Sequence, residues 1–465
     1  MKTFPLLASF IVVLANLTAA SPVQARTWYI LPDGSGDAPT IQAGIDSCVY
    51  SDTVSVACGT YFEQEIIIKS GIVLRSETGE ADCVTIDARQ LGRVLTCVDV
   101  DPTTTIEGFT VTGGLTEGSG SDAFGGGVYC YNSSPNIVNC WFIGNSALTG
   151  GGFACRHSSN PHIVGCLFGE NSSGGIGGGM FINHSAPELY QCQFVDNLVD
   201  QDGAGICCTF SSAVIFYCLF QDNIAGIWGG AMEITGSEGM PIVANCTMVG
   251  NSAGNAGGAF FSADHCQFTL EYSIITDSHE SAAIYIQGEP SFRGILCCNV
   301  FGNEIANYGG ELVDQTGWNG NISASPLFCS PETDDFHLAD NSPCLPGNNE
   351  CGALIGAFGA GCATTTISGN SVPKNIFLSQ CFPNPFNPIT TIRFDLPEAQ
   401  NVQLNIYAVD GEHITTLVNE ELISGPHSVT WNGIDDQRRL VASGIYVYRL
   451  EAGAYVESRR MVVVR

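Results

Sequence analysis

The sequence predicts an all-β protein whose larger part is a right-handed parallel β-helix. One short phrase ending in Asn recurs about every 26 residues between Gly125 and Asn303. Its apolar positions alternate over only three to five residues, which is the period of a strand, and no helical period accompanies them. Repeats of this length fold as stacked units, because no single unit can bury its apolar face alone. Short strands separated by tight bends therefore give a coil of parallel sheets.

The core position of the phrase is expected to form an inward column of stacked side chains. It is occupied by Cys140, Cys166, Cys192, Cys218, Cys246 and Cys298, with a degenerate copy at Tyr272. A second inward column is expected at Phe142, Phe168, Phe194, Phe220, Met248, Ile274 and Val300. Equivalent residues of successive coils lie about 4.8 Å apart. Vertical neighbours point the same way, so these cysteines are expected to be buried free thiols.

The Asn that ends the phrase is expected to form a third column, at a bend. The column consists of Asn145, Asn171, Asn197, Asn223, Asn251 and Asn303. Stacked amides can satisfy one another and the turn backbone, and Asn tolerates the left-handed conformation that a bend needs. The sequence therefore predicts a polar ladder along one edge of the coil.

A second phrase, small residues followed by apolar ones, keeps step with the first. Its alternation turns one position outward, and that position carries Tyr129, Phe181, Glu233, Phe261 and Tyr285. Exposed aromatic side chains can stack on sugar rings or mark a protein contact, so these five residues are the candidate ligand face. The alternative is that a loop covers them. Glu233 has Cys207 and Phe261 as column neighbours, which favours a solvated surface group over a catalytic one.

The repeats resemble those of known families. The recurring Pro, Ile, Asn-Cys and Phe pattern resembles the β-helix repeats of the pectin-lyase-like superfamily. The F-x-x-N and G-G-A phrases, as at residues 220–223 and 229–232, resemble the repeats of chlamydial polymorphic outer-membrane proteins. The resemblance covers residues 28 to 362 approximately, and it implies the fold much more strongly than any activity.

The N-terminus reads as an export signal followed by a cap. Residues 1–25 combine Lys2, an apolar run and small residues ending at Ala25, where cleavage is expected. The run is too short for a membrane anchor, and no later segment is long enough to span a bilayer. Residues 26–100 are expected to form the N-terminal cap and the first coils. A helix over residues 40–48 would cover the open first coil, whose edge is otherwise exposed.

The remaining β-helix is expected to run from 101 to 317, with a C-terminal cap over 318–362 and a linker over 363–377. The cap contains cysteines in irregular chain, where a bridge restricts loops. One or two disulfides are expected among four of them, with the pairing left open: Cys329, Cys344, Cys351 and Cys362.

Residues 378–465 change in composition and read as a small immunoglobulin-like β-sandwich, with alternating strands between Gly and Pro turns. They resemble the type A sorting domain of type IX secretion cargo and the related domain of the flagellar hook-cap protein. The resemblance rests on residues 383–388, 404–411, 431–433 and 442–446. It implies recognition by outer-membrane secretion machinery, and a secreted or surface-held protein of a Gram-negative-type bacterium. The alternative is a sandwich that only stabilises the C-terminus.

Charge excludes several partners of the β-helix. Residues 26–362 carry 36 Asp and Glu against 7 Lys and Arg, and only Arg156 and Arg293 are basic between Val94 and Pro373. Such a field repels pectate and nucleic acid unless a cation intervenes. The hydrolase motifs N-T-D and G-H-G are absent from the β-helix strands, and the pair Asp334 and Asp335 lies in the closing segment.

A calcium site is the one cofactor that the sequence suggests. Asp196, Asp200, Asp202 and Asp222 cluster on successive bends, where oxygen ligands from stacked turns can hold Ca²⁺. The alternative is a set of solvated acidic loops. Five histidines are expected to lie in different columns, which argues against a metal or proton-relay site: His157, His162, His184, His265 and His279.

These observations favour an exported, monomeric, adhesin-like surface protein that binds a glycan or a protein without catalysis. The rival is a polysaccharide lyase or glycoside hydrolase. It predicts two close carboxylates, or a carboxylate cluster beside a basic residue such as Arg156 or Arg293. A third possibility is a structural stalk with no ligand site.

Overall fold

The computed structural model describes residues 25–263, 265–288 and 294–362, and in the C-terminal part residues 376–378, 381, 390–397, 399–409, 411–422, 425–453 and 455–463. The chain divides into two compact units, Met1–Thr364 and Thr365–Arg465. The expected signal peptide and linker fall almost wholly outside the described residues, as does the motif at 383–388.

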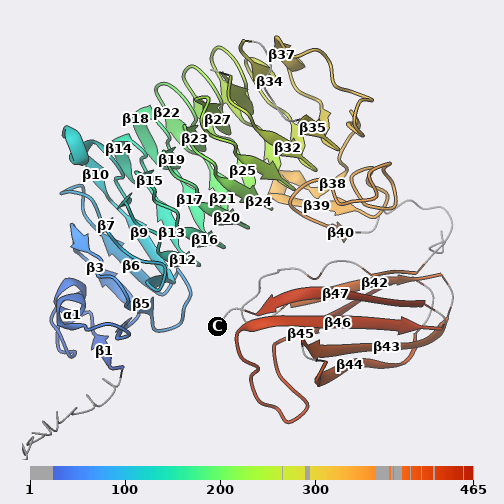
Figure 1. Cartoon of the computed structure of the whole chain (residues 1–465), viewed down its shortest axis with the longest axis horizontal. Helices are drawn as coiled ribbons and strands as arrows, with labels where there is room; N and C mark the ends of the chain where they lie inside the picture. Colours follow the sequence, from blue (N-terminus) through green and yellow to red (C-terminus); the bar gives the residue numbers. More distant parts are fainter. Residues whose placement is uncertain are drawn as a thin grey trace, which may run out of the picture. The chain divides into compact units, whose positions relative to one another are not determined.

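The first unit is a parallel β-helix, as the repeat predicts (Figure 1). Its coils contribute in turn to three long sheets, and the first of these is sheet A. Sheet A contains β1 (Thr27–Ile30), β2 (Thr53–Val56), β5 (Val73–Ser76), β8 (Thr105–Glu107), β12 (Asn136–Val138), β16 (His162–Val164), β20 (Glu188–Tyr190), β24 (Val214–Phe216), β28 (Ile242–Ala244), β32 (Thr269–Glu271) and β35 (Gly294–Leu296).

Sheet B carries the repeated cysteine phrase. It contains β3 (Gly59–Tyr61), β6 (Val84–Asp87), β9 (Phe109–Thr112), β13 (Trp141–Ile143), β17 (Leu167–Gly169), β21 (Gln193–Val195), β25 (Leu219–Gln221), β29 (Thr247–Val249), β33 (Ile274–Thr276) and β36 (Asn299–Phe301). Its strands pair in register, so each residue lies over its equivalent in the coil below.

Sheet C carries the second phrase, and a short sheet D bridges sheets B and C. Sheet C contains β4 (Ile66–Ile67), β7 (Leu95–Val98), β11 (Val128–Tyr131), β15 (Phe153–Arg156), β19 (Met180–Asn183), β23 (Ile206–Thr209), β27 (Met232–Thr235), β31 (Phe260–Ser262), β34 (Ala282–Ile286) and β37 (Ala306–Gly310). Sheet D contains β10 (Leu115–Thr116), β14 (Ser146–Thr149), β18 (Ser172–Ile176), β22 (Leu198–Val199), β26 (Ile224–Ala225) and β30 (Ser252–Ala253). The chain between β10 and β11 also forms the short helix η1 (Gly120–Ala123).

The inward columns fill one continuous core, and the cysteine ladder is part of it. Cys140, Cys166 and Cys192 are buried free thiols, and the backbone N–H of Cys140 lies 3.4 Å from Cys166 Sγ. Phe194 stacks between Phe168 and Phe220, with ring centroids 4.6 and 4.9 Å apart. Both predicted inward columns are therefore confirmed over these coils.

The sequence prediction for the degenerate repeat is wrong by one residue, because it puts Tyr272 and Ile274 in the inward columns. Met248 pairs with Ile275, so Ile275 stands in the inward column and Ile274 points outward. Ser273 takes the place of the cysteine, and its hydroxyl accepts a hydrogen bond from the backbone N–H of Cys246 at 3.1 Å. Tyr272 occupies the preceding left-handed position, with φ +48°. The repeat has changed length here, so its most similar letters no longer mark equivalent positions.

The asparagine ladder is present from Asn145 to Asn251, as predicted. Asn171 Nδ2 donates to Asn197 Oδ1 at 3.1 Å, and Asn197 Nδ2 donates to Asn223 Oδ1 at 2.8 Å. Each amide also reaches a strand carbonyl, such as that of Phe168. The left-handed residue of each bend is the one before the Asn, for example Asp196 with φ +54°. The asparagines themselves therefore serve as buried hydrogen-bonding groups.

Helix α1 (Ile41–Ser47) forms where the sequence predicts a helix. The hydroxyl of Thr40 accepts a hydrogen bond from the N–H of Ala43 at 3.1 Å, which is an N-cap interaction. Ile41 and Ile45 are buried in the same core as the first strands. The role of α1 as a cap stays a prediction.

The segment after β37 folds back along the side of the coil. Strands β38 (Phe328–Ser330), β39 (Asp335–Ala339) and β40 (Ala360–Cys362), with the short helix η2 (Pro331–Thr333), make a small sheet. Its apolar residues pack on outward residues of sheet B, including Leu219, Val249 and Ile274. We call residues 327–362 the strap. The segment expected to be the closing cap therefore covers one face of the last coils, and its role as a cap stays a prediction.

The second unit consists of two antiparallel sheets around one apolar core. One sheet contains β41 (Phe377–Leu378), β42 (Thr390–Leu396) and β45 (Gly425–Trp431); the other contains β43 (Gln400–Ala408), β44 (His413–Leu422), β46 (Gly444–Ala452) and β47 (Tyr455–Val463). Trp431, Tyr448 and Phe394 are buried between them. The small β unit is confirmed, whereas an immunoglobulin-like topology stays a prediction.

Candidate ligand-binding surface

The aromatic stripe predicted on sheet C is not exposed. Tyr129 and Phe181 are 5 % exposed, Phe261 is 1 % exposed, and only Tyr285 is partly accessible. The bends beside sheet D fold over the stripe, and Trp228 stacks on Phe261 with ring centroids 5.1 Å apart. Strand alternation correctly identified the outward side, but it carries no information about what folds over it. The alternative of a covering loop is the correct one.

Glu233 is also buried, and it lies against a thiol. Its Oε2 accepts a hydrogen bond from Cys207 Sγ at 3.0 Å. Burial raises the pKa of the Cys207 thiol, and the Glu233 carboxylate raises it further. A buried pair of this kind cannot present a ligand face. The expectation of a solvated glutamate is therefore wrong.

The four predicted calcium ligands do not converge. Asp196 and Asp222 share a column, and desolvation together with repulsion from Asp222, Glu170 and Asp334 raises the pKa of Asp196. Asp200 is exposed on a different bend, while Asp202 is buried beneath the bends over sheet C. The four residues are close in sequence, but the bend after sheet B carries Asp196 and Asp222, whereas the bend after sheet D carries Asp200 and Asp202. Closeness in sequence therefore did not mean closeness in space.

The buried carboxyl group of Asp202 should make the stability of the fold depend on pH. Burial raises its pKa, while a backbone hydrogen bond from Trp228 opposes the shift, and Oδ1 has no hydrogen-bond partner. An acid with a raised folded-state pKa stabilises the fold at low pH, and that contribution is lost as the pH rises above 3.8. Asp202→Asn should therefore be more stable than the wild type at pH 7, by on the order of 1 kcal/mol. Urea unfolding followed at pH 4 and 7, with the exposed Asp200→Asn as control, measures this; a less stable Asn variant at pH 7 would contradict it.

Two of the histidines share a column, contrary to the sequence prediction. His157 and His184 stack with ring centroids 6.4 Å apart, between Tyr131 and Phe210. The left-handed bend after each strand of sheet C brings them together. Among the described residues, the one group of three with metal-ligand spacing is Cys58, Glu77 and Cys83, whose two cysteines form a disulfide.

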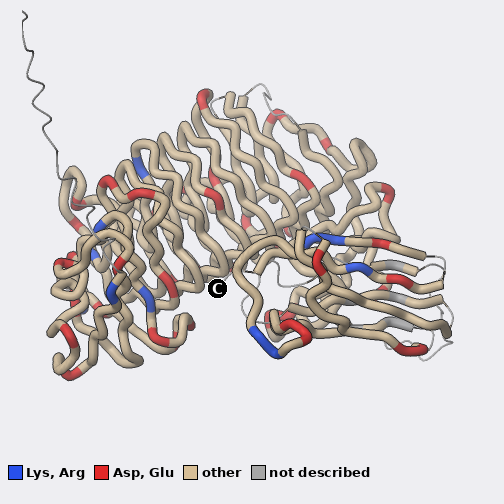
Figure 2. The backbone as a smooth tube through the Cα atoms, turned by 60° about the horizontal axis from the view of Figure 1, so that its bottom comes forward, with Lys and Arg blue, Asp and Glu red and all other residues tan. Residues whose placement is uncertain are grey.

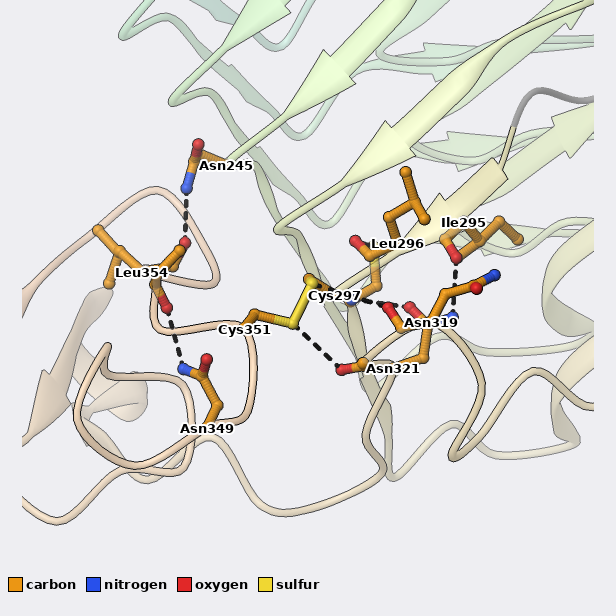
Figure 3. Close-up of a disulfide and its surroundings, with 12 residues drawn as sticks. Asn245, Ile295, Leu296, Cys297, Asn319, Asn321, Asn349, Cys351 and Leu354 are labelled. Carbon is orange, nitrogen blue, oxygen red and sulfur yellow. Dashed lines mark hydrogen bonds between the residues drawn. A yellow bond between two sulfur atoms is a disulfide. The ribbon is translucent and has the colours of Figure 1, made fainter.

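The cap cysteines pair only in part with one another. Cys329 bonds to Cys362, whereas Cys351 bonds to Cys297 of the coil. Cys344 is a buried thiol whose sulfur lies 3.1 Å from Asn299 Nδ2. Figure 3 shows the Cys297–Cys351 bridge beside Asn245, whose Nδ2 donates to the carbonyl of Leu354 at 2.7 Å. The Cys297–Cys351 bridge and this hydrogen bond tie the strap to the coil at the bends before β36 and β29, whereas the Cys329–Cys362 bridge joins two residues of the C-terminal segment itself.

One part of sheet B stays open to solvent. Trp141, Leu167 and Gln193 are outward residues of three successive coils, and they stand in register. Trp141 is 38 % exposed, Gln193 is exposed and Leu167 is half-buried. We call these three residues the open strip. Sequence reasoning missed it, although Trp141 lies between inward Cys140 and Phe142 and must therefore point outward.

A hollow of about 220 Å³ lies at the Trp141 end of the open strip. It is lined by Trp141, Glu80, Ala81, Asp82, Asn139 and Gly165. Asn139 and Gly165 occupy left-handed bends in successive coils, and a Cβ on Gly165 would lie 2.9 Å from Asn139 Oδ1. A side chain at this glycine would therefore crowd the hollow. The arrangement sets an accessible indole beside two carboxylates and an amide.

The surroundings of the open strip are acidic. Figure 2 shows Lys and Arg mainly in the N-terminal coils and in the C-terminal unit, while Asp and Glu are spread over bends along the whole β-helix. Arg75, beside the loop that carries Glu80, pairs with Glu107 at 3.9 Å, and the guanidinium of Arg156 lies 4.0 Å from the centre of the Phe124 ring. Arg293 lies outside the described residues. An anionic ligand would therefore meet repulsion on this face.

Comparisons with known proteins agree with both units. Residues 70–247 match the family model described as a right handed beta helix region, and residues 380–464 match the secretion system C-terminal sorting domain. No curated protein matches the chain. Helices within the described residues are too short and too polar to cross a membrane.

Two solved structures show limited similarity. Dimeric latent PorU from Porphyromonas gingivalis is 19 % identical with a TM-score of 0.18, over 20 % of this chain and 10 % of that one. The enzymatically active domain of tailspike protein 4 from bacteriophage CBA120 is 10 % identical with a TM-score of 0.19, over 89 % of this chain and 63 % of that one. This chain thus spans a small part of the first and less than two thirds of the second.

Proposed function

We propose that this chain, which carries a right-handed β-helix region and a type IX secretion sorting domain, is a surface protein that binds a neutral glycan. Export follows from the sorting domain, which implies contact with the secretion machinery. The binding part rests on one observation, the exposed Trp141 in a hollow that also contains Glu80, Asp82 and Asn139.

The chemistry of the hollow suits a neutral sugar. An indole presents a large flat apolar surface to the C–H face of a pyranose ring. Carboxylate oxygens accept hydrogen bonds from hydroxyl groups, and an amide both donates and accepts them. The net charge of 29 negative over residues 26–362 favours a neutral chain over a uronate polymer.

Binding without turnover agrees with the exposure of the acids. Glycoside hydrolysis needs one carboxyl group that keeps its proton near neutral pH, and burial is the usual means of providing this. Glu80 and Asp82 are both exposed. Elimination from a uronate would need a free cation, but Arg75, beside the loop that carries Glu80, is paired with Glu107 at 3.9 Å, and Arg156 is held against Phe124.

The second candidate is a glycoside hydrolase that uses the same hollow. The observation in its favour is that two carboxylates, Glu80 and Asp82, line it together. Release of reducing ends from neutral polysaccharides by the purified protein, abolished by Glu80→Gln or Asp82→Asn, would establish this candidate and refute the non-catalytic one.

Replacing Trp141 with Ala should lower the affinity for the best neutral glycan about tenfold or more, because the stacking surface is lost. A glycan array identifies that ligand, and isothermal titration calorimetry measures the change. Tyr131→Ala is the matched control, because this ring is 37 % exposed but lies on sheet C. Equal losses in both variants, or no loss in the Trp141 variant, would contradict the assignment of the site.

A further inference from the structure

We infer that the open strip is closed at both ends and therefore binds about three sugar units, as a short oligosaccharide or the end of a chain. The inference rests on the proposed function, because it names the ligand class for the same site. It depends on what lies over sheet B beyond Trp141 on one side and beyond Gln193 on the other.

The first end is closed by the loop over residues 77–83. Thr110, the outward residue of the coil before Trp141, donates its hydroxyl to the carbonyl of Ala81 at 2.9 Å. The Cys58–Cys83 disulfide fixes the end of this loop. Glu77 Oε1 accepts a hydrogen bond from the N–H of Cys58 at 2.9 Å. A ligand on the strip therefore meets this anchored loop, with its exposed Glu80 and Asp82, at the coil before Trp141.

The second end is closed by the strap. Leu219, the outward residue of the coil after Gln193, is 4 % exposed because Phe336 packs on it. Gln221 Nε2 donates to Asp334 Oδ1 at 2.6 Å, which ties the edge of the strap to the same coil. The Cys329–Cys362 bridge closes the small sheet of the strap. A ligand cannot pass this point along the sheet without displacing apolar contacts.

The spacing of the sheet sets the length. Thr110 and Leu219 are four rungs apart, about 19 Å, and the three open rungs between them occupy about 14 Å. A β-linked pyranose unit is about as long as one sheet spacing, so about three units fit between the two walls. Each open rung also offers a polar side chain at one end of its strand: Asn139 precedes the strand of Trp141, whereas Glu170 and Asp196 follow the strands of Leu167 and Gln193.

The test is calorimetry with neutral β-1,4-linked gluco-, manno- and xylo-oligosaccharides of two to six units. Affinity for the preferred series should rise up to about three units and then stay within about twofold. Gln193→Ala should shift this plateau to about two units, whereas Gln201→Ala, on an exposed bend of sheet D, should leave it in place.

The outcomes separate the two proposals. Affinity that keeps rising to six units, or an unchanged plateau in the Gln193 variant, overturns the closed strip while leaving the glycan site standing. Binding that is lost in Trp141→Ala but independent of length means that the chain crosses the strands, and it also overturns the closed strip. No binding of any neutral oligosaccharide, with binding of a cationic peptide instead, overturns both.

Discussion

Replacing Asn197 with Asp is expected to destabilise the β-helix by about 3–5 kcal/mol at neutral pH, because it leaves an unpaired charge in the core. Asn197 is fully buried, and its Nδ2 donates to the carbonyl of Phe168 at 2.9 Å and to Asn223 Oδ1 at 2.8 Å. Aspartate has nearly the same shape, so no cavity forms. The second carboxylate oxygen of the aspartate would instead face two other acceptors, the carbonyl of Phe168 and Asn223 Oδ1, at these distances.

The neighbouring amides cannot adapt to the change. Asn223 already uses its own Nδ2 to reach the carbonyl of Phe194 and Asn251 Oδ1, both at 2.9 Å. Turning Asn223 over would therefore move the mismatch one coil along. Equilibrium urea unfolding followed by circular dichroism measures the effect. Asn255→Asp, an exposed bend residue, is the control and should change the unfolding free energy by less than about 0.5 kcal/mol. Equal effects in the two variants would show that the ladder contributes little.

The sequence predicts the inside of the coil better than its outside, for a physical reason. A buried column such as Phe168, Phe194 and Phe220 must repeat the same kind of side chain, since each ring packs on its equivalent above and below. The recurrence of the same residue type in the sequence therefore identifies the buried column. Where the repeat changes length, as at Tyr272, the letters mislead by one residue.

Outward residues carry no such constraint, and the exposure of each depends on segments distant in sequence. Phe261 is covered by Trp228, and Leu219 by Phe336, while Trp141 remains accessible. Strand alternation alone predicts that all three side chains point outward, and it does not predict which of them are covered. The candidate site was missed for this reason: Glu80 approaches Trp141 only because coils separated by many residues lie side by side.

Each unit has its own apolar core. Ile41, Cys140 and Phe194 belong to one, and Trp431 and Tyr448 belong to the other. The charges differ as well, since residues 378–465 carry 10 acidic against 7 basic side chains, whereas residues 26–362 are strongly acidic. Secretion machinery that recognises the weakly charged C-terminal unit does not have to contact the strongly acidic β-helix.

Deleting residues 365–465 is therefore expected to leave a folded β-helix that does not reach the cell surface. The truncated chain keeps all three disulfides and the whole of its core, so its circular dichroism and its resistance to proteolysis should match the same region of the full chain. Its surface signal, measured by protease shaving and antibody labelling of intact cells of the native host, should fall to background. A fusion of residues 365–465 to an unrelated exported β protein is the control, and it should appear on the surface. If the truncated chain reached the surface, export would depend on the β-helix, and the C-terminal unit would be left with a stabilising role alone.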